Sequence, residues 1–148
     1  PKQAGMSDDR FFLLCINHNL KRTARATTQA FDTALRPHGL RIGQFNALAA
    51  LRQLGDLTLK QMGEFLGLDR TTLLRSIEPL AERGLIEREK EGRRVILRMT
   101  PEGRNLFRKT FPVWRQTQEA MLDAFGRERW EAMKRDCHDL ERIAQETK

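Results

Sequence analysis

The chain has 148 residues, of which 32% are charged and 39% hydrophobic, a composition typical of one globular domain with its own core. Lysine and arginine outnumber aspartate and glutamate by 27 to 20, and the resulting net charge of +7 favours a polyanionic partner. A membrane or secreted protein is not expected, because no apolar run approaches the roughly 20 residues of a membrane span and the start, PKQAGMSDDR, lacks the apolar stretch of a signal peptide.

The first predicted element is one long helix over about residues 9–36. Apolar or small residues recur in it every three or four positions, and Pro37 and Gly39 close it. A second helix is predicted over residues 43–55, GQFNALAALRQLG, which stops at its final glycine.

Two shorter helices follow, joined by a tight turn. Thr58 and Gln61 form a capping-box pattern at the start of LTLKQMGEFLG, and Gly67 ends this helix. Asp69 is a good N-cap residue for the next helix, DRTTLLRSIEPLAERG, which ends at Gly84. Two helices joined in this way are typical of a helix-turn-helix.

After this unit the hydrophobic period changes from helical to alternating. Residues 85–99 predict a β-hairpin. Thr100 can cap the next helix, and Pro101 suits its first position. That helix carries an aromatic seam and is expected to bend at Pro112, which lacks a backbone donor. A final helix repeats the apolar seam over residues 130–144.

Residues 70–83, placed on a helix at about 100° per residue, separate into two faces. Leu73, Ile77 and Leu80 fall in one narrow arc and should face the core, which leaves Thr71 and Arg75 opposite and Thr72 at the flank of the exposed arc. Arg70 is angularly nearer the core, but in the first turn its long side chain can reach outward. Small hydroxyls let a helix approach a DNA groove closely, and arginine offers a fork for guanine or a charge for phosphate. A solvated helix face would show the same residue types. The predicted DNA-binding residues of this helix are Arg70, Thr71, Thr72 and Arg75.

The predicted hairpin is strongly basic near its turn. Arg93 and Arg94 are placed there to reach a minor groove or a neighbouring phosphate. The alternative interpretation is an exposed hairpin decorated with charge pairs. The capped two-helix unit that precedes the hairpin shifts the balance towards DNA.

Together these features resemble a MarR-family winged-helix regulator. The resemblance covers about residues 10–145 and rests on the stretches PHGLRIGQFNALAAL, LTLKQMGEFLGLDRTTLLRSIEPLAERGLIERE and EGRRVILRMTPEGRNLF. It implies a mainly α fold with a small β-hairpin wing, in one protomer over residues 1–148. A DNA-binding winged helix at about 40–100 is then flanked by dimerisation helices at about 8–36 and 101–146.

The resemblance also implies a function. Such regulators are homodimers that place recognition helices in successive major grooves of double-stranded DNA and wings in the flanking minor grooves, and many release DNA when a small aromatic or phenolic effector binds. We therefore expect a cytoplasmic, ligand-responsive repressor of a pseudo-palindromic operator, with half-sites about 10 base pairs apart. By position, the four outward residues match the family's recognition helix, and Arg93 matches its wing-tip arginine. Candidate residues of an effector pocket are His18, Arg22, Phe45 and Trp114.

Three alternatives remain at this point. Some relatives sense peroxide through a cysteine near the start of the first helix, which Cys15 suggests, but those relatives hold the cysteine with tyrosine hydroxyls and this chain has no tyrosine. Packing is the competing interpretation for Cys15 and Cys137. The two cysteines fit a reducing compartment, and because they lack metal-ligand spacing, no metal or cofactor is expected.

A non-specific architectural DNA-binding protein is a closer rival to the sequence-specific regulator. An enzyme is not expected, because the three histidines are scattered and no HExxH, GxSxG or glycine-rich phosphate loop occurs.

Overall fold

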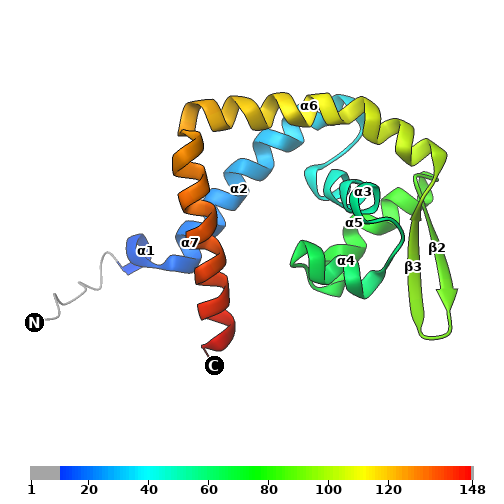
Figure 1. Cartoon of the computed structure of the whole chain (residues 1–148), viewed down its shortest axis with the longest axis horizontal. Helices are drawn as coiled ribbons and strands as arrows, with labels where there is room; N and C mark the ends of the chain where they lie inside the picture. Colours follow the sequence, from blue (N-terminus) through cyan, green and yellow to red (C-terminus); the bar gives the residue numbers. More distant parts are fainter. Residues whose placement is uncertain (1–10, 148) are drawn as a thin grey trace, which may run out of the picture.

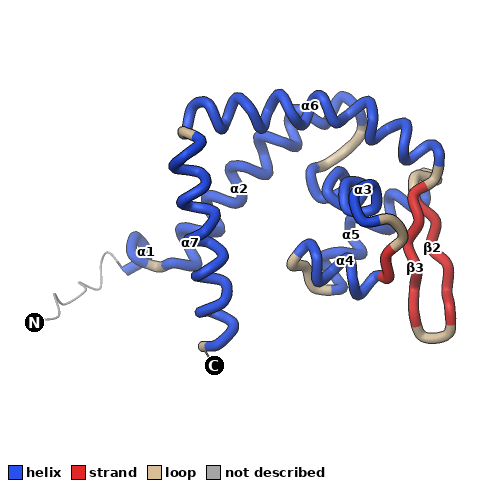
Figure 2. The backbone as a smooth tube through the Cα atoms, in the orientation of Figure 1, coloured by secondary structure: helices blue, strands red, loops and turns tan. Residues whose placement is uncertain are grey.

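The computed structural model describes residues 11–147, which form helices and one small antiparallel sheet (Figures 1 and 2). In chain order the elements are α1 (Phe11–Leu14), α2 (Ile16–Leu35), the short 3-10 helix η2 (Arg36–His38), α3 (Ile42–Leu54), β1 (Leu57–Thr58), α4 (Leu59–Leu66), α5 (Arg70–Glu82), β2 (Ile86–Glu91), β3 (Arg94–Met99), α6 (Pro101–Phe125) and α7 (Arg127–Glu146). The mainly helical fold class with a hairpin wing is confirmed.

The long helices α2, α6 and α7 form an open frame around the smaller elements. Figure 1 shows α6 running from the sheet across the top of the molecule to α7, which turns down beside α2. Helices α3, α4 and α5 hang below α6, and the β2–β3 hairpin projects beyond them. The frame and the smaller helical lobe are therefore joined through α6 and through the chain between α2 and α3.

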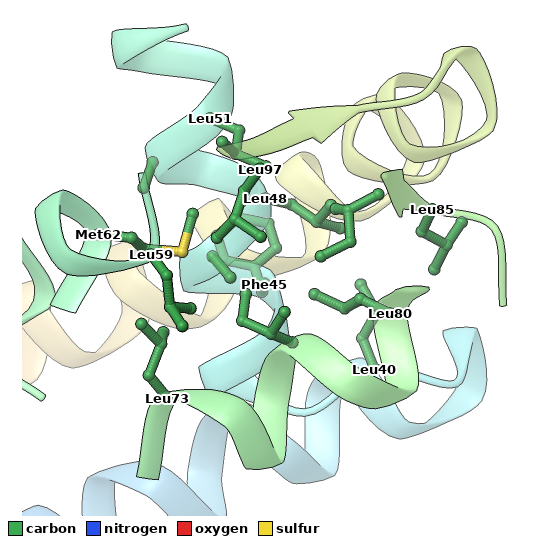
Figure 3. Close-up of a cluster of buried hydrophobic side chains, with 14 of the residues drawn as sticks. Leu40, Phe45, Leu48, Leu51, Leu59, Met62, Leu73, Leu80, Leu85 and Leu97 are labelled. Atoms are coloured by element: carbon green, nitrogen blue, oxygen red, sulfur yellow. The ribbon is translucent and has the colours of Figure 1, made fainter. Parts of the chain in front are cut away.

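The core lies in the lobe of α3, α4, α5 and the sheet, where the stripes of three amphipathic helices meet (Figure 3). Leu73, Ile77 and Leu80 are at most 1% exposed, as the periodicity of α5 predicts. Leu48 of α3, Met62 of α4 and Leu97 of β3 are completely buried. Burying such a side chain stabilises the fold by about 1.5 to 3 kcal/mol.

The predicted helix ends in this lobe are confirmed by their hydrogen bonds. The Gln61 backbone N–H donates to Thr58 Oγ1 at 3.0 Å, and the Thr58 N–H donates to Gln61 Oε1 at 2.9 Å, which completes the capping box. Gly67 ends α4 in the left-handed conformation, with φ 68°. Thr100 caps α6 by accepting the Gly103 N–H at 3.0 Å, and Pro101 begins that helix.

The predicted single helix over residues 9–36 is wrong at Cys15. Residues 9 and 10 lie outside the described range, and the helical segment beyond them is interrupted between α1 and α2. Cys15 has an extended ψ of 117°, and its Sγ accepts the His18 N–H as the N-cap of α2. The side-chain amide of Asn19 donates to the carbonyls of Leu13 and Cys15. These side-chain bonds replace helical ones at the break, a local competition that apolar periodicity does not report.

The sheet contains a strand that the sequence does not predict. The hairpin pairs Ile86 with Met99 and Glu91 with Arg94, in agreement with the hairpin expected over residues 85–99. The two-residue strand β1 lies on the other side of β3, with Thr58 opposite Ile96. A strand of two residues has no alternation to detect, and only its pairing defines it.

Candidate nucleic-acid interface

The N-terminus of α5 is held by a rigid cap. Asp69 Oδ1 accepts the Thr72 backbone N–H at 2.8 Å, and its Oδ2 accepts the Thr72 hydroxyl at 3.0 Å. These two bonds, the backbone one first, lower the pKa of Asp69 below its ordinary value of 3.8, and the nearby Arg75 charge acts in the same direction. The first turn of α5, which a groove would meet, is therefore fixed before any contact with DNA.

The predicted DNA-binding residues of α5 are exposed to solvent, and the two arginines among them are not engaged in ion pairs within the described part of the chain. Arg70, Thr71, Thr72 and Arg75 are all exposed; Thr71 and Arg75 lie opposite the buried stripe of the helix, whereas Arg70 is exposed because it stands in the first turn. Within residues 11–147, neither of the two arginines forms an ion pair. Thr72 already uses its hydroxyl hydrogen in the cap, so it can meet DNA as an acceptor or through its methyl group. The arrangement suits phosphate or base-edge contacts.

The wing presents its two turn arginines differently. Gly92 allows the tight turn with φ 60°, and Arg93 and Arg94 beside it are exposed. Arg94 lies 3.6 Å from Glu91, whereas Arg93 has no ionic partner in the described part of the chain. Of the two arginines at the wing tip, Arg93 is thus the one whose charge is not engaged in an ion pair within the described residues.

A third arginine stiffens the wing near its base. Arg98 on β3 donates through Nε to Asp56 at 3.0 Å and through Nη1 to Glu89 of β2. Asp56 immediately precedes β1, so the guanidinium ties the chain at the start of β1 to both strands of the hairpin. Nothing in the local sequence separates Arg98 from the arginines at the hairpin turn, and only the fold, which brings Asp56 and Glu89 to it, reveals this different role.

The recognition helix and the wing face a common hollow. Arg70 of α5 and Arg93 of the wing both line a concavity of about 810 Å³, together with Lys60 of α4. Glu141 and Gln145 of α7 line its far side. Lys60 was not among the predicted site residues, because it is a single exposed lysine and only the fold brings it beside the arginines.

The four candidate effector-pocket residues do not converge on one site. Phe45 is 2% exposed and stacks on Trp114, with ring centroids 5.7 Å apart. His18 instead lies beside Phe12, with ring centroids 5.8 Å apart, and Arg22 is exposed on α2. The structure brings two of the four together, and both pack with Phe107 or Phe111.

An apolar groove lies between α2, α6 and α7. Its volume is about 540 Å³, and beyond it the N-terminal segment exposes Phe12, Leu13 and Leu14 by about 60% each. Cys137 lines this groove, in keeping with the packing interpretation of that residue. The apolar residues that line the groove include Leu20, Phe31, Met121, Leu122, Phe125, Trp130 and Met133.

Comparison with known proteins identifies the fold. The family model described as MarR family matches residues 40–94, the segment from just before α3 to the first residue of β3. The crystal structure of the M. tuberculosis transcriptional regulator MosR is 34% identical, with 88% of this chain and 96% of that chain covered and a TM-score of 0.78. The chain belongs to the MarR family. Its relatives are transcriptional regulators rather than enzymes.

Two further comparisons bear on DNA binding. MosR has also been solved in complex with DNA, at 32% identity and a TM-score of 0.79, with 88% of this chain and 96% of that chain covered. The HTH-type transcriptional regulator YwoH of Bacillus subtilis is 26% identical over 117 residues, which cover 78% of this chain and 85% of YwoH. This MarR-family chain is thus a DNA-binding transcriptional regulator.

A more distant likeness concerns effectors. The structure of Bordetella bronchiseptica BpsR is 24% identical, with a TM-score of 0.76 and with 86% of this chain and 93% of that chain covered. The DNA binding of BpsR is regulated by 6-hydroxynicotinic acid. At this identity the likeness establishes a shared fold.

Among residues 11–147 of the present chain, no helix is long and apolar enough to cross a membrane.

Proposed function

We propose that this regulator is a homodimeric, ligand-responsive repressor that binds a pseudo-palindromic operator. The observation that carries the proposal is the capped first turn of α5, whose exposed Arg70 shares one hollow with Arg93 of the wing. A helix for the major groove and an arginine for an adjacent groove thereby lie on one side of the lobe.

The proposed DNA contacts are of two kinds, contacts to base edges and contacts to phosphates or the minor groove. Arg75, one turn into α5, would read a guanine edge or hold a phosphate, and Thr71 would approach a base edge or backbone oxygen. Arg70, Arg93 and Arg94 would supply charge to the phosphates or to a narrow minor groove. The net charge of +7 supports this electrostatic component.

The proposed dimer is built from about residues 8–36 and 101–146, leaving about 40–100 to bind DNA. Residues 8–10 of the first segment lie outside the described range. In the described part, a second copy would bury the apolar groove between α2, α6 and α7 and the exposed apolar side chains of α1. A two-fold axis would then present two α5 helices to successive half-sites.

The proposed effector is a small aromatic molecule. BpsR, which shares the fold, responds to an aromatic acid. In this chain, stacked rings of α2, α3 and α6 lie where the frame meets the DNA-binding lobe: Phe31, Phe45 and Trp114 are joined by centroid distances of 6.5 and 5.7 Å. An effector that separates these rings would shift the dimer towards a form whose recognition helices are wrongly spaced.

Selection of bound sequences from a random DNA pool tests the proposal, followed by titration of the best site against scrambled DNA at fixed salt. We expect a two-fold-symmetric motif with half-sites about 10 base pairs apart and a preference of at least about a thousandfold. Sedimentation of the complex should show two chains per site. Weak, salt-sensitive binding without a motif would support the architectural alternative instead.

A further inference from the structure

The segment between α2 and α3, residues 36–41, is the junction through which the helical frame enters the DNA-binding lobe (Figure 1). Gly39 ends η2 with φ 69°, and its N–H donates to the Arg36 carbonyl at 2.9 Å. Leu40, which follows, is 2% exposed and belongs to the same buried cluster as Leu80 of α5 (Figure 3). The junction is therefore packed into the lobe.

One side chain ties this junction to α2. The Oδ1 of Asp32 accepts the backbone N–H of Ile42 at 2.7 Å, across ten residues of chain. Asp32 is partly buried in the last turn of α2, and Ile42 is the first residue of α3. The bond gives a partner to an N–H that the start of a helix leaves unpaired, and it fixes the start of α3 against the end of α2.

A second side chain ties the junction to the end of the recognition helix. Arg83 is the C-cap residue of α5, and its Nη1 donates to the Gly39 carbonyl at 2.6 Å, a contact across 44 residues. A Cβ placed on Gly39 would lie 3.3 Å from Nη2 of the same guanidinium, so the group lies directly against the glycine. Its positive charge also meets the C-terminal end of the α2–η2 segment, where helix carbonyls favour a cation.

Helix α5 has a further close approach, at Ser76, to the first turn of α3, directly after the junction. A Cβ on Gly43 would lie 2.9 Å from Ser76 Oγ, so α3 and α5 pack closely at that glycine. Ser76 and Arg83 are separated by seven residues, or about 10 Å along the helix axis. The buried stripe of Leu73, Ile77 and Leu80 holds α5 in the lobe. The Arg83 bond and the Ser76 contact, at that separation, then bear on the direction of α5 relative to the junction and the start of α3.

We propose that Arg83 is a positioning residue that fixes the direction of the recognition helix relative to α2 and thereby sets the half-site spacing that the dimer accepts. The inference rests on the proposed dimeric function. Arg70 is six residues, about 9 Å, from Ser76, so a tilt of about 10° about Ser76 would move it by roughly 1.6 Å. The two-fold axis doubles this change to about 3 Å between the helices, close to the rise of one base pair.

The test measures spacing preference rather than affinity alone. Operators would carry the two selected half-sites at centre-to-centre distances from about 8 to 12 base pairs, around the expected spacing of one helical turn. Each would be titrated with the full-length wild type, Arg83→Met, Arg83→Lys and the control Arg108→Met, which removes an exposed charge from α6. We expect Arg83→Met to reduce the preference for the best spacing by about fivefold or to move its optimum, in line with the loss of a charged hydrogen bond. Arg83→Lys should retain part of the preference, and Arg108→Met should match the wild type.

Each outcome decides a separate point. An Arg83→Met profile with the wild-type optimum and equally weakened binding at every spacing would overturn the inference while leaving the dimeric regulator intact. A wild type without any symmetric motif or spacing optimum would overturn the proposed function, and the inference with it. Should Arg83→Met melt below the assay temperature, Arg83→Gln, which keeps a donor without the charge, gives the same comparison.

Discussion

The N-terminus of α6 packs on the base of the wing at a position where only glycine fits. A Cβ on Gly103 would lie 2.1 Å from the carbonyl oxygen of Leu85 and 2.9 Å from Met99 Cγ. That carbonyl accepts the Thr100 N–H at 3.1 Å, and Thr100 in turn caps α6. Gly103→Ala should therefore destabilise the fold and displace the wing relative to α6.

The size of the effect follows from the geometry. Since ordinary contacts begin at 3.4 Å, the Leu85 carbonyl or the helix must move by about 1.3 Å. Overpacking of this kind costs about 1 to 3 kcal/mol, and an unpaired buried N–H costs about 1 to 3 kcal/mol more. Replacing a helical glycine by alanine returns about 1 kcal/mol through helix propensity. We expect a net loss of about 3 kcal/mol in the free energy of unfolding.

Urea unfolding followed by circular dichroism measures this loss, with all proteins at one concentration because a dimer's stability depends on it. Gly43→Ala is the matched control. It is also a helical glycine, but its close neighbour at 2.9 Å is the Ser76 hydroxyl, which can rotate away, so its change should stay within about 1 kcal/mol. A Gly103→Ala protein as stable as Gly43→Ala would refute the reasoning.

Three further predictions concern α5. Leu80→Ala, at a completely buried site, should lower the free energy of unfolding by about 2 to 5 kcal/mol; a loss below about 1 kcal/mol would mean that the core does not depend on this stripe. Arg75→Ala should weaken operator binding by about 10- to 100-fold, mainly through lost discrimination at one base pair, whereas an equal loss on all sequences would identify a phosphate contact. Because the cap bonds lower the pKa of Asp69 below 3.8, its stabilising contribution is present above that pH and is lost as the pH falls through the folded-state value. Thermal unfolding between about pH 6 and 2.5 should show a smaller acid loss for Asp69→Asn, which caps without ionising, and parallel curves would contradict the cap's role.

Local chemistry made most of the DNA-binding lobe predictable. The capping box at Thr58, the N-cap at Asp69 and the stripe of Leu73, Ile77 and Leu80 each depend on residues within one or two helical turns, so the sequence specifies them directly. The outward position of Thr71 and Arg75 follows from the same geometry, because fixing the buried face of a helix also fixes the exposed one.

The break at Cys15, the strand β1 and the scattered effector-pocket residues were not predictable in this way. The break depends on side-chain hydrogen bonds of Asn19 that compete with the helix. The pocket candidates were chosen by their order along long helices, and two residues on such helices can lie far apart even when both helices meet at one place. His18 and Trp114 show this, since His18 packs near Phe12 whereas Trp114 stacks on Phe45.

The sequence by itself determined the helix-turn-helix, the hairpin and the charged face of α5, because these are set by periodicity and by caps between near neighbours. Tertiary structure alone decided which distant groups meet. Arg98 joins Asp56 to Glu89, and Arg83 reaches Gly39, although nothing in the chain near either arginine distinguishes it from the other basic residues. Such contacts arise only when packing of the core brings the ends of separate elements together, and for that reason the direction of the recognition helix is a property of the whole fold.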